Sequence, residues 1–178
     1  MRNCIFLSLC EIEPGTIVTG GFMTGVYSID KKSMNINLMT PQSYKLTNNP
    51  NITNKYIRVI YRDKAGLIWT GGNKYLGCTD KKNRTFKHYL IDNAITCIQE
   101  LDSTTLLIGT GNGMYRFNKN KQQISQMRMP FASQQINAIY LHSNGDLYIG
   151  TMSSGLVILR SNGEFEQYLQ QTSSLLSN

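Results

Sequence analysis

The fold is decided by the stretch Leu67-Ile68-Trp69-Thr70-Gly71-Gly72, because three other segments of the chain repeat its pattern. They are Thr16-Ile17-Val18-Thr19-Gly20-Gly21, Leu106-Leu107-Ile108-Gly109-Thr110-Gly111 and Leu147-Tyr148-Ile149-Gly150-Thr151-Met152. Taking Val18, Trp69, Ile108 and Ile149 as equivalent gives spacings of 51, 39 and 41 residues, the first of them lengthened by an insertion around residues 39–53. A period near 40 residues is typical of one β-propeller blade.

Each repeat has the same order of elements around this anchor strand. An apolar run precedes it, at Cys4–Leu9, Tyr56–Tyr61, Ala94–Ile98 and Ile136–Leu141. These runs have no helical spacing, so we expect innermost strands that are buried on both faces. Asn144-Gly145 predicts a two-residue hairpin, because both residue types accept a positive φ. A polar fourth strand, clearest at residues 84–89, is expected at the outer edge of the sheet, facing water.

The sequence therefore predicts an all-β chain, a β-propeller fragment of four consecutive four-stranded antiparallel blades. A single sheet of this kind cannot bury both of its faces, so neighbouring blades must stack and share a core. We place the blades at about residues 4–40, 54–90, 93–128 and 135–170, and residues 171–178 resemble the lead-in to a further blade.

The second repeat resembles the two-component regulator propeller repeat, through Ile57-Arg58-Val59-Ile60-Tyr61-Arg62-Asp63-Lys64-Ala65-Gly66-Leu67-Ile68-Trp69-Thr70-Gly71. That motif combines an apolar strand, an Asp, a Gly, an apolar residue before Trp, a Gly-Thr step and a Gly-Leu pair. The fourth repeat is similar through Asn144-Gly145-Asp146-Leu147-Tyr148-Ile149-Gly150-Thr151 and Gly155-Leu156. The third repeat departs from the motif because it lacks the hairpin Gly, and the first has Pro14-Gly15 in its place.

The resemblance implies a role in signalling. Such repeats build the periplasmic sensor regions of hybrid two-component system histidine kinases of Bacteroides-type bacteria, which detect oligosaccharide fragments for polysaccharide utilisation. It therefore implies a periplasmic sensor module with an oligosaccharide ligand, inside a parent protein that is a histidine kinase. Two alternatives stay open: a stand-alone propeller interaction module that assembles with a second chain, and a remnant of a glycan-degrading propeller enzyme.

No catalytic residues are predicted, because the chain has no kinase, hydrolase or phosphate-loop motif. Its acidic residues fall mostly in turns, where an Asp accepts hydrogen bonds from its own backbone; they are Asp63, Asp80, Asp102 and Asp146. Trp69 is expected in the core and not as a sugar platform, since Val18, Ile108 and Ile149 take its place in the other repeats. We therefore expect a binding protein and not an enzyme.

The net charge of +7 does not predict a nucleic-acid partner, because the basic residues are scattered. Several of them recur at one place in successive repeats, namely Lys31, Lys32, Lys81, Lys82, Arg84, Lys119 and Lys121. That place is a turn, so solvated hairpin tips are the favoured interpretation and an anion-attracting rim the alternative.

Composition also argues against a metal site and a cofactor. Cys4, Cys10, Cys78 and Cys97 have no metal-ligand spacing, and each is expected as a small buried apolar residue, although a disulfide stays open. No metal and no cofactor is predicted. The apolar run after Met1 is too short for a convincing signal peptide and aligns with a strand, and no segment is long enough to span a membrane.

A ligand is expected at the loops between the second and third strands and between blades, which emerge on one side of a propeller. The candidates are Phe22, Asn73, Lys74 and Tyr75, with Lys74 and Tyr75 first. A sugar ring needs an apolar surface to stack on and polar groups for its hydroxyls, and an aromatic side chain beside amide and ammonium donors supplies both.

The two end blades each leave one sheet face without a neighbour in a row of four. We therefore expect either a homodimer formed through the end blades or closure into a small four-bladed ring.

Overall fold

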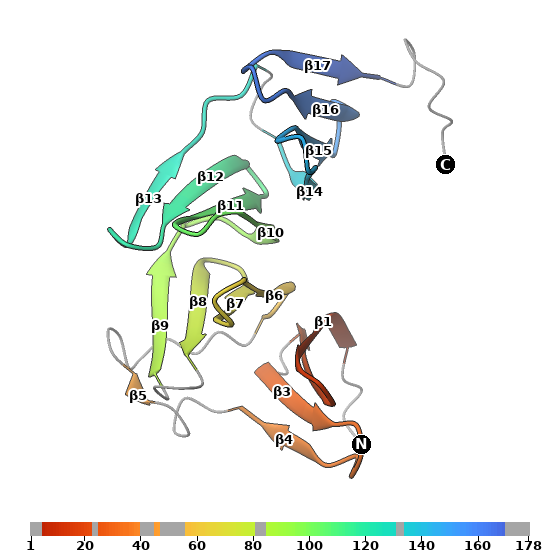
Figure 1. Ribbon diagram of the computed structural model, residues 1–178, viewed down its shortest axis with the longest axis vertical. Coiled ribbons are helices and arrows are strands. Elements are labelled where there is room, and N and C mark those ends of the chain that lie inside the picture. Colours follow the sequence, from red (N-terminus) through yellow and green to blue (C-terminus); the bar gives the residue numbers. More distant parts are fainter. Residues whose placement is uncertain are drawn as a thin grey trace. The chain divides into compact units, whose positions relative to one another are not determined.

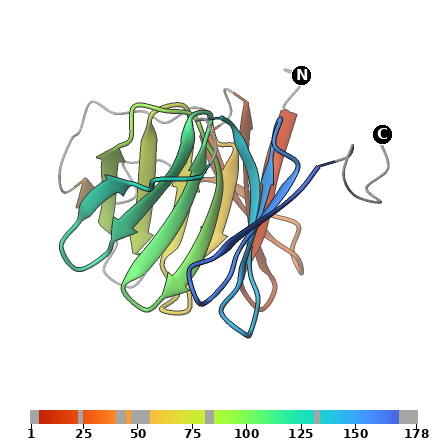
Figure 2. The ribbon, with the colours of Figure 1, turned by 90° about the horizontal axis from the view of Figure 1, so that it is seen from above.

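A computed structural model describes residues 5–22, 25–39, 45–46, 56–80, 85–130 and 134–169. Every regular element in these ranges is a strand, and the strands form four sheets, each with four consecutive antiparallel strands side by side (Figures 1 and 2). The predicted all-β class of four propeller blades is confirmed. The chain divides into two compact units, Met1–Ile95 and Thr96–Asn178, each of which contains two blades. Predicted features at Cys4, Lys81, Lys82, Arg84 and 171–178 lie outside the described residues.

The first unit holds the first two blades. Blade 1 has the order β1 (Ile5–Glu13), β2 (Thr16–Phe22), β3 (Gly25–Asp30) and β4 (Ile36–Leu38). Blade 2 consists of β6 (Val59–Arg62), β7 (Ile68–Gly71), β8 (Tyr75–Asp80) and β9 (Thr85–Leu90), with β5 (Lys45–Leu46) added beside β9.

The second unit holds blades 3 and 4. Blade 3 consists of β10 (Ile95–Asp102), β11 (Thr105–Thr110), β12 (Gly113–Asn118) and β13 (Gln123–Gln126). Blade 4 consists of β14 (Ile136–Leu141), β15 (Leu147–Thr151), β16 (Leu156–Leu159) and β17 (Phe165–Tyr168). Only the first residue of β10, Ile95, is counted with the first unit.

A repeated joint connects consecutive blades. Ile57 lies over Gly20 of the preceding blade so closely that a Cβ placed on the glycine would come 2.7 Å from Ile57 Cγ2. The backbone N–H of Ile57 donates to Gly21 O at 3.0 Å. In the same unit Ile95 lies over Gly71 and donates to Gly72 O at 2.8 Å. The glycine is therefore required because the next blade's first strand fills the space of its side chain.

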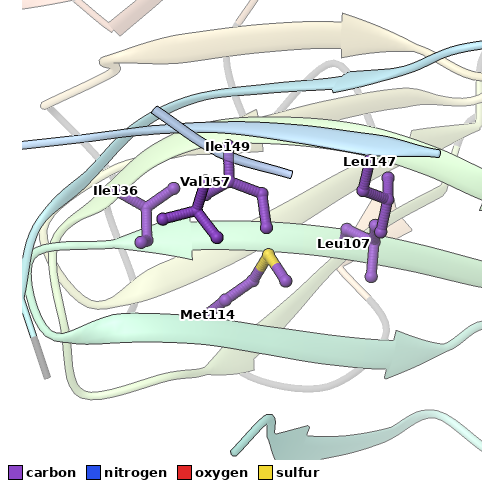
Figure 3. Close-up of a cluster of buried hydrophobic side chains, with 6 residues drawn as sticks. All are labelled: Leu107, Met114, Ile136, Leu147, Ile149 and Val157. Atoms are coloured by element: carbon purple, nitrogen blue, oxygen red, sulfur yellow. The ribbon is translucent and has the colours of Figure 1, made fainter. Parts of the chain in front are cut away.

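The second unit repeats the joint with Ile136 over Gly109, whose added Cβ would come 2.9 Å from Ile136 Cγ2. Ile136 belongs to a fully buried cluster between blades 3 and 4, drawn in Figure 3, with Leu107, Met114, Leu147, Ile149 and Val157. The matching cluster of the first unit contains Ile12, Val18, Ile57, Ile60 and Ile68. Stacked blades thus share the apolar cores that the repeat predicted.

The joint corrects the alignment of the repeats. Gly20, Gly71 and Gly109 take the same place under an isoleucine, so the residue equivalent to Trp69 in blade 3 is Leu107 and not Ile108. In blade 4 it is Tyr148 and not Ile149, because Gly150 follows it by two residues as Gly71 follows Trp69. The following Thr confirms this register, since Thr110 Oγ1 and Thr151 Oγ1 each donate to the Gly that precedes or opens the third strand, Gly113 O and Gly155 O, at 2.8 Å.

Two further expectations about strands were wrong. In β1, Ile5, Phe6, Leu7 and Leu9 are exposed rather than buried on both faces. In blade 2, β9 is not the edge strand, because β5 pairs with it in parallel, Lys45 opposite Thr85 and Leu46 opposite Phe86. His88 of β9 is buried.

The hairpin at Asn144-Gly145 is longer than predicted. His142 and Asp146 are connected by a hydrogen bond of 2.9 Å from His142 N to Asp146 O, and Gly145 N donates to His142 O at 3.0 Å. Gly145 has a φ of 90°, whereas Asn144 does not have a positive φ. The same turn joins Asp63 to Leu67, with Gly66 at a φ of 84°, so one glycine suffices for each turn.

Candidate functional site

The motif Asp63 to Trp69 is a structural element. Asp63 is buried, and its carboxylate accepts a hydrogen bond from Leu67 N and another from Trp69 Nε1, both 2.9 Å long. The Trp69 ring is buried as well, as predicted. Asp102 accepts hydrogen bonds from the Thr104 hydroxyl and from Thr104 N, and these lower the pKa of Asp102. The hydrogen bonds of these two carboxylates therefore stabilise turns.

The basic hairpin tips differ from one another. Lys31 pairs with Glu11 at 2.9 Å on the surface, as solvated tips should. Lys119 pairs with Glu100 at 2.7 Å, but the two side chains are only 10% and 2% exposed. The prediction of solvated tips is therefore wrong for Lys119, which is folded back onto the first strand of its own blade.

An aromatic pair lies at the end of the first unit where β2 is followed by β3 and β7 by β8, which we call the loop end. Phe22 ends β2 and Tyr56 lies just before β6, and their ring centroids are 4.7 Å apart in an edge-to-face arrangement. Phe22 is about half exposed, with a relative exposure of 49%. Tyr56 is half-buried, so the exposed part of the pair is mainly the Phe22 ring, whose apolar surface fits the face of a sugar ring.

Two of the predicted residues, Asn73 and Lys74, lie in the loop between β7 and β8 at the same end of the unit. Lys74 Nζ is 2.9 Å from Asp92 Oδ1, and hydrogen bonding to Asp92 raises the pKa of Lys74. The loop is held to the next one by Ile91 N, which donates to Lys74 O at 2.9 Å. Asn73 is exposed. The loop therefore presents an amide beside an ammonium and a carboxylate.

Tyr75 has a different environment from the other candidates. It opens β8 as a half-buried residue, and its ring contacts the buried imidazole of His88 at a centroid distance of 6.0 Å. The same imidazole contacts Phe86 at 4.4 Å, and burial lowers the pKa of His88 to about 4. Tyr75 is thus partly a packing residue of blade 2.

Two of the four candidates contact a residue that the sequence did not single out. Phe22 contacts Tyr56, and Lys74 contacts Asp92. Tyr56 was missed because it opens an apolar run and was assigned to a strand. Asp92 was missed because an isolated Asp between two strands carries no signal beyond a turn. Its φ of 56° shows that it does take a turn conformation.

A second candidate site lies in the other unit, at the end of blade 3 that carries the β10–β11 and β12–β13 turns. It is a groove of about 590 Å³ on one face of the sheet. The register places Arg116 opposite Ser125 and Asn118 opposite Gln123 on this face, and Asp102 and Lys121 also line it. Cations, amides and a hydroxyl in one groove can bind a hydroxylated or anionic ligand. The loop rule used on the sequence pointed to the other end of the blade.

Within the described ranges, no group of three His, Cys, Asp or Glu residues is placed to hold a metal ion. Cys78 is buried and Cys10 and Cys97 are half-buried, and burial raises the pKa of the Cys97 thiol to about 11. A search of the described residues finds no helix that is long and apolar enough to cross a membrane.

Comparison with protein families gives one match. The family model for the two component regulator propeller matches residues 130–153, which contain β14, the following turn and β15. The resemblance noted in the fourth repeat is therefore confirmed. None of the curated proteins compared with the chain matches it.

Solved structures share the fold. An extracellular domain assigned to a hybrid two component system of B. thetaiotaomicron is 17% identical with a TM-score of 0.76, over 94% of this chain and 22% of that one. An extracellular domain assigned to a one component system of the same organism is 20% identical with a TM-score of 0.76, over 97% and 23%. A streptogramin B lyase is 18% identical with a TM-score of 0.73, over 94% and 55%. The chain thus spans about a quarter of the two extracellular domains.

Proposed function

We propose that this chain is a sensor propeller module of a hybrid two-component regulatory system and that it binds oligosaccharide fragments. The observation that carries the proposal is the family match at residues 130–153, in a chain whose blades share their fold with extracellular domains of signalling systems. The same likeness supports a periplasmic location. The parent protein in this proposal would supply the kinase.

The proposed ligand site is the loop end of the first unit. Phe22 and Tyr56 supply the apolar surface, and Asn73 with the Lys74–Asp92 pair supplies donors and acceptors for hydroxyl groups. Tyr75 has a positioning role, since its ring packs against His88. The groove of blade 3 is a competing location, and an experiment has to distinguish the two.

The test is a titration of the purified chain with a panel of oligosaccharides, followed by calorimetry and by the shift in melting temperature. Phe22→Ala and Tyr56→Ala should each weaken binding about tenfold or more, since a base- or ligand-stacking ring contributes about 1–3 kcal/mol. Gln123→Ala, in the blade 3 groove, is the matched control and should leave binding unchanged. Loss of binding in Gln123→Ala with normal binding in Phe22→Ala would move the site to the groove.

The same titration separates a sensor from an enzyme. We expect each bound oligosaccharide to be recovered intact by mass spectrometry after prolonged incubation. Cleavage of any oligosaccharide would contradict the sensor proposal and favour the glycan-degrading alternative. A panel in which no oligosaccharide binds would contradict the ligand class.

A further inference from the structure

In the part of the chain that the structure describes, the isoleucine-over-glycine joint lacks one of its two halves in blade 1 and the other half in blade 4. In three joints an isoleucine at the start of a blade covers a glycine of the preceding blade: Ile57, just before β6, over Gly20, Ile95 over Gly71 and Ile136 over Gly109. Within the described residues, blade 1 has a first strand with no glycine beneath it, and blade 4 has a glycine with no residue above it. The two halves of one further joint are therefore present on the same chain.

Phe6 takes the isoleucine position in blade 1. In blade 4 the pairing shifts by one residue between Ile136 and Ala138, where Ala138 is opposite Gly150. In blade 1 it shifts in the same way between Phe6 and Ser8, where Ser8 is opposite Gly20. Phe6 thus corresponds to Ile136, but Phe6 is 50% exposed and Ile136 is 0% exposed.

An apolar sheet face surrounds Phe6. Its ring contacts Tyr27 edge to face, at a centroid distance of 6.1 Å. The register places Leu9 and Leu38 in one row with Tyr27, and Ile36 lies in the next row on the same face. Leu9, Ile36 and Leu38 are all exposed. A face of this composition is the kind that the other blades bury against a neighbour.

Gly150 takes the glycine position in blade 4. The atoms nearest to an added Cβ are those of Ala138, at 3.7 Å or more, whereas Gly20 and Gly109 are in tight contact with an isoleucine. Tyr140 and Tyr148 lie opposite each other on the same face as Ala138 and Gly150, and Tyr140 is exposed. Open space bordered by aromatic rings fits a plug that is larger than isoleucine, and phenylalanine is such a residue.

We infer that a second copy of this chain covers the two open faces, with Phe6 of one copy seated over Gly150 of the other. The contact joins two different surfaces, so it is heterologous, and two such contacts close a pair of chains into a ring. Two copies contribute eight blades, which lies within the range of about four to eight blades in closed propellers. The pair removes all four exposed end faces at once.

The test uses the full chain and measures its mass in solution by light scattering and sedimentation over a hundredfold concentration range. The wild-type chain should have twice the mass of the 20.1 kDa monomer. Phe6→Asp and Gly150→Val should each give the monomer mass, because each variant damages both contacts of its own pair. Met34→Asp is the matched control, since Met34 is an exposed apolar residue in the turn after β3 and should leave the pair intact.

Mixing the two variants gives the sharpest outcome. A pair of one Phe6→Asp chain and one Gly150→Val chain has one contact with both defects and one intact contact, so mixing should restore association in part. Circular dichroism establishes that each variant is folded. A wild-type monomer at all concentrations, which would leave the faces to another chain or to closure within one chain, overturns the inference. So does a mixture that stays monomeric while the wild type pairs, or a variant that pairs normally.

Discussion

One lysine position shows how burial changes the value of the same interaction. In blades 1 and 3 the lysine after the third strand donates its backbone N–H to the first hairpin, Lys31 to Gly15 O and Lys119 to Thr104 O, both at 2.7 Å. Its ammonium then pairs with a glutamate of the first strand. The Lys31 and Glu11 side chains are 50% and 47% exposed, but those of Lys119 and Glu100 are only 10% and 2% exposed. The two pairs look alike in sequence and differ in energy.

We therefore predict that Lys119→Met lowers the free energy of unfolding by about 3–5 kcal/mol, because it leaves the Glu100 carboxylate buried without its cation. Lys31→Met is the matched control and should change stability little, since water solvates Glu11 in its place. Urea unfolding of both variants measures the difference. Equal effects of the two substitutions would show that the Lys119 pair is solvated like the other.

His88 gives the chain a dependence on pH. Burial lowers the pKa of His88 in the folded state to about 4, below its ordinary value of 6.5. Between these values the unfolded chain binds a proton that the folded chain does not. The free energy of unfolding should therefore be constant above pH 6.5 and fall as the pH decreases from 6.5 to 4, by up to about 3 kcal/mol in all.

His88→Phe is the comparison that assigns this dependence. A phenyl ring has no proton to gain and can pack against Phe86 and Tyr75 as the imidazole does. Urea unfolding at pH 7, 6 and 5 should show a decline in the parent chain and a nearly constant free energy in the variant. The same decline in both chains would assign the effect to other groups.

At the scale of elements, the period and the order of the strands could be predicted from the sequence, but the register could not. The sequence alignment matches the apolar residue that directly precedes the Thr-Gly or Gly-Thr step of each repeat. Because Thr precedes the glycine in Thr70-Gly71 but follows it in Gly109-Thr110, this alignment places the two glycines one residue out of register. The fixed position is the glycine, because the next blade's isoleucine occupies the space of its side chain. That isoleucine lies 24 to 37 residues later in the chain (Gly71 to Ile95, Gly20 to Ile57), so no local pattern reveals it.

The same reason explains which parts of the candidate site were found. Phe22 and Asn73 follow from their loops, which the repeat places at strand ends. Tyr56 and Asp92 become visible only when two loops meet in space. The pairing of β5 with β9 was also unpredictable, because Lys45 and Leu46 form two residues of strand without any alternating pattern.

The joint itself can be tested at this scale with one matched pair of glycines in the second unit. In a Phe6→Asp background, which keeps the chain monomeric, Gly109→Ala should destabilise the protein by about 1–3 kcal/mol, since its Cβ would collide with Cys97 and Ile136. Gly150→Ala should change stability by less than about 0.5 kcal/mol, because its Cβ meets only Ala138 at an ordinary distance. Urea midpoints at constant slope measure both. A large effect at Gly150 would show that the position is already covered.

For the whole molecule, function and assembly are separate questions that the same chain can answer. The ligand site proposed above lies on loops at the strand ends of the first unit, whereas the faces proposed to pair lie on the first and the last blade. Phe6→Asp should therefore leave the affinity for an oligosaccharide unchanged, and Phe22→Ala should leave the pair intact. Failure of one proposal does not imply failure of the other.

The pairing of chains also predicts how thermal stability depends on concentration. A folded state that exists as a pair is stabilised by mass action, so the melting temperature of the wild-type chain should rise by about 1–3 °C for each tenfold increase in concentration. The melting temperatures of Phe6→Asp and Gly150→Val should not depend on concentration, and Met34→Asp should behave as the wild type does. Differential scanning fluorimetry from 1 to 100 µM, on the order of the range in which pairs of micromolar affinity dissociate, measures this dependence. A wild-type melting temperature that is independent of concentration, together with a monomer mass, would mean that the exposed face around Phe6 is stable in water without a second copy. The contacts of blade 1 with Ile57 and Ile60 of blade 2 would then be sufficient to keep blade 1 folded.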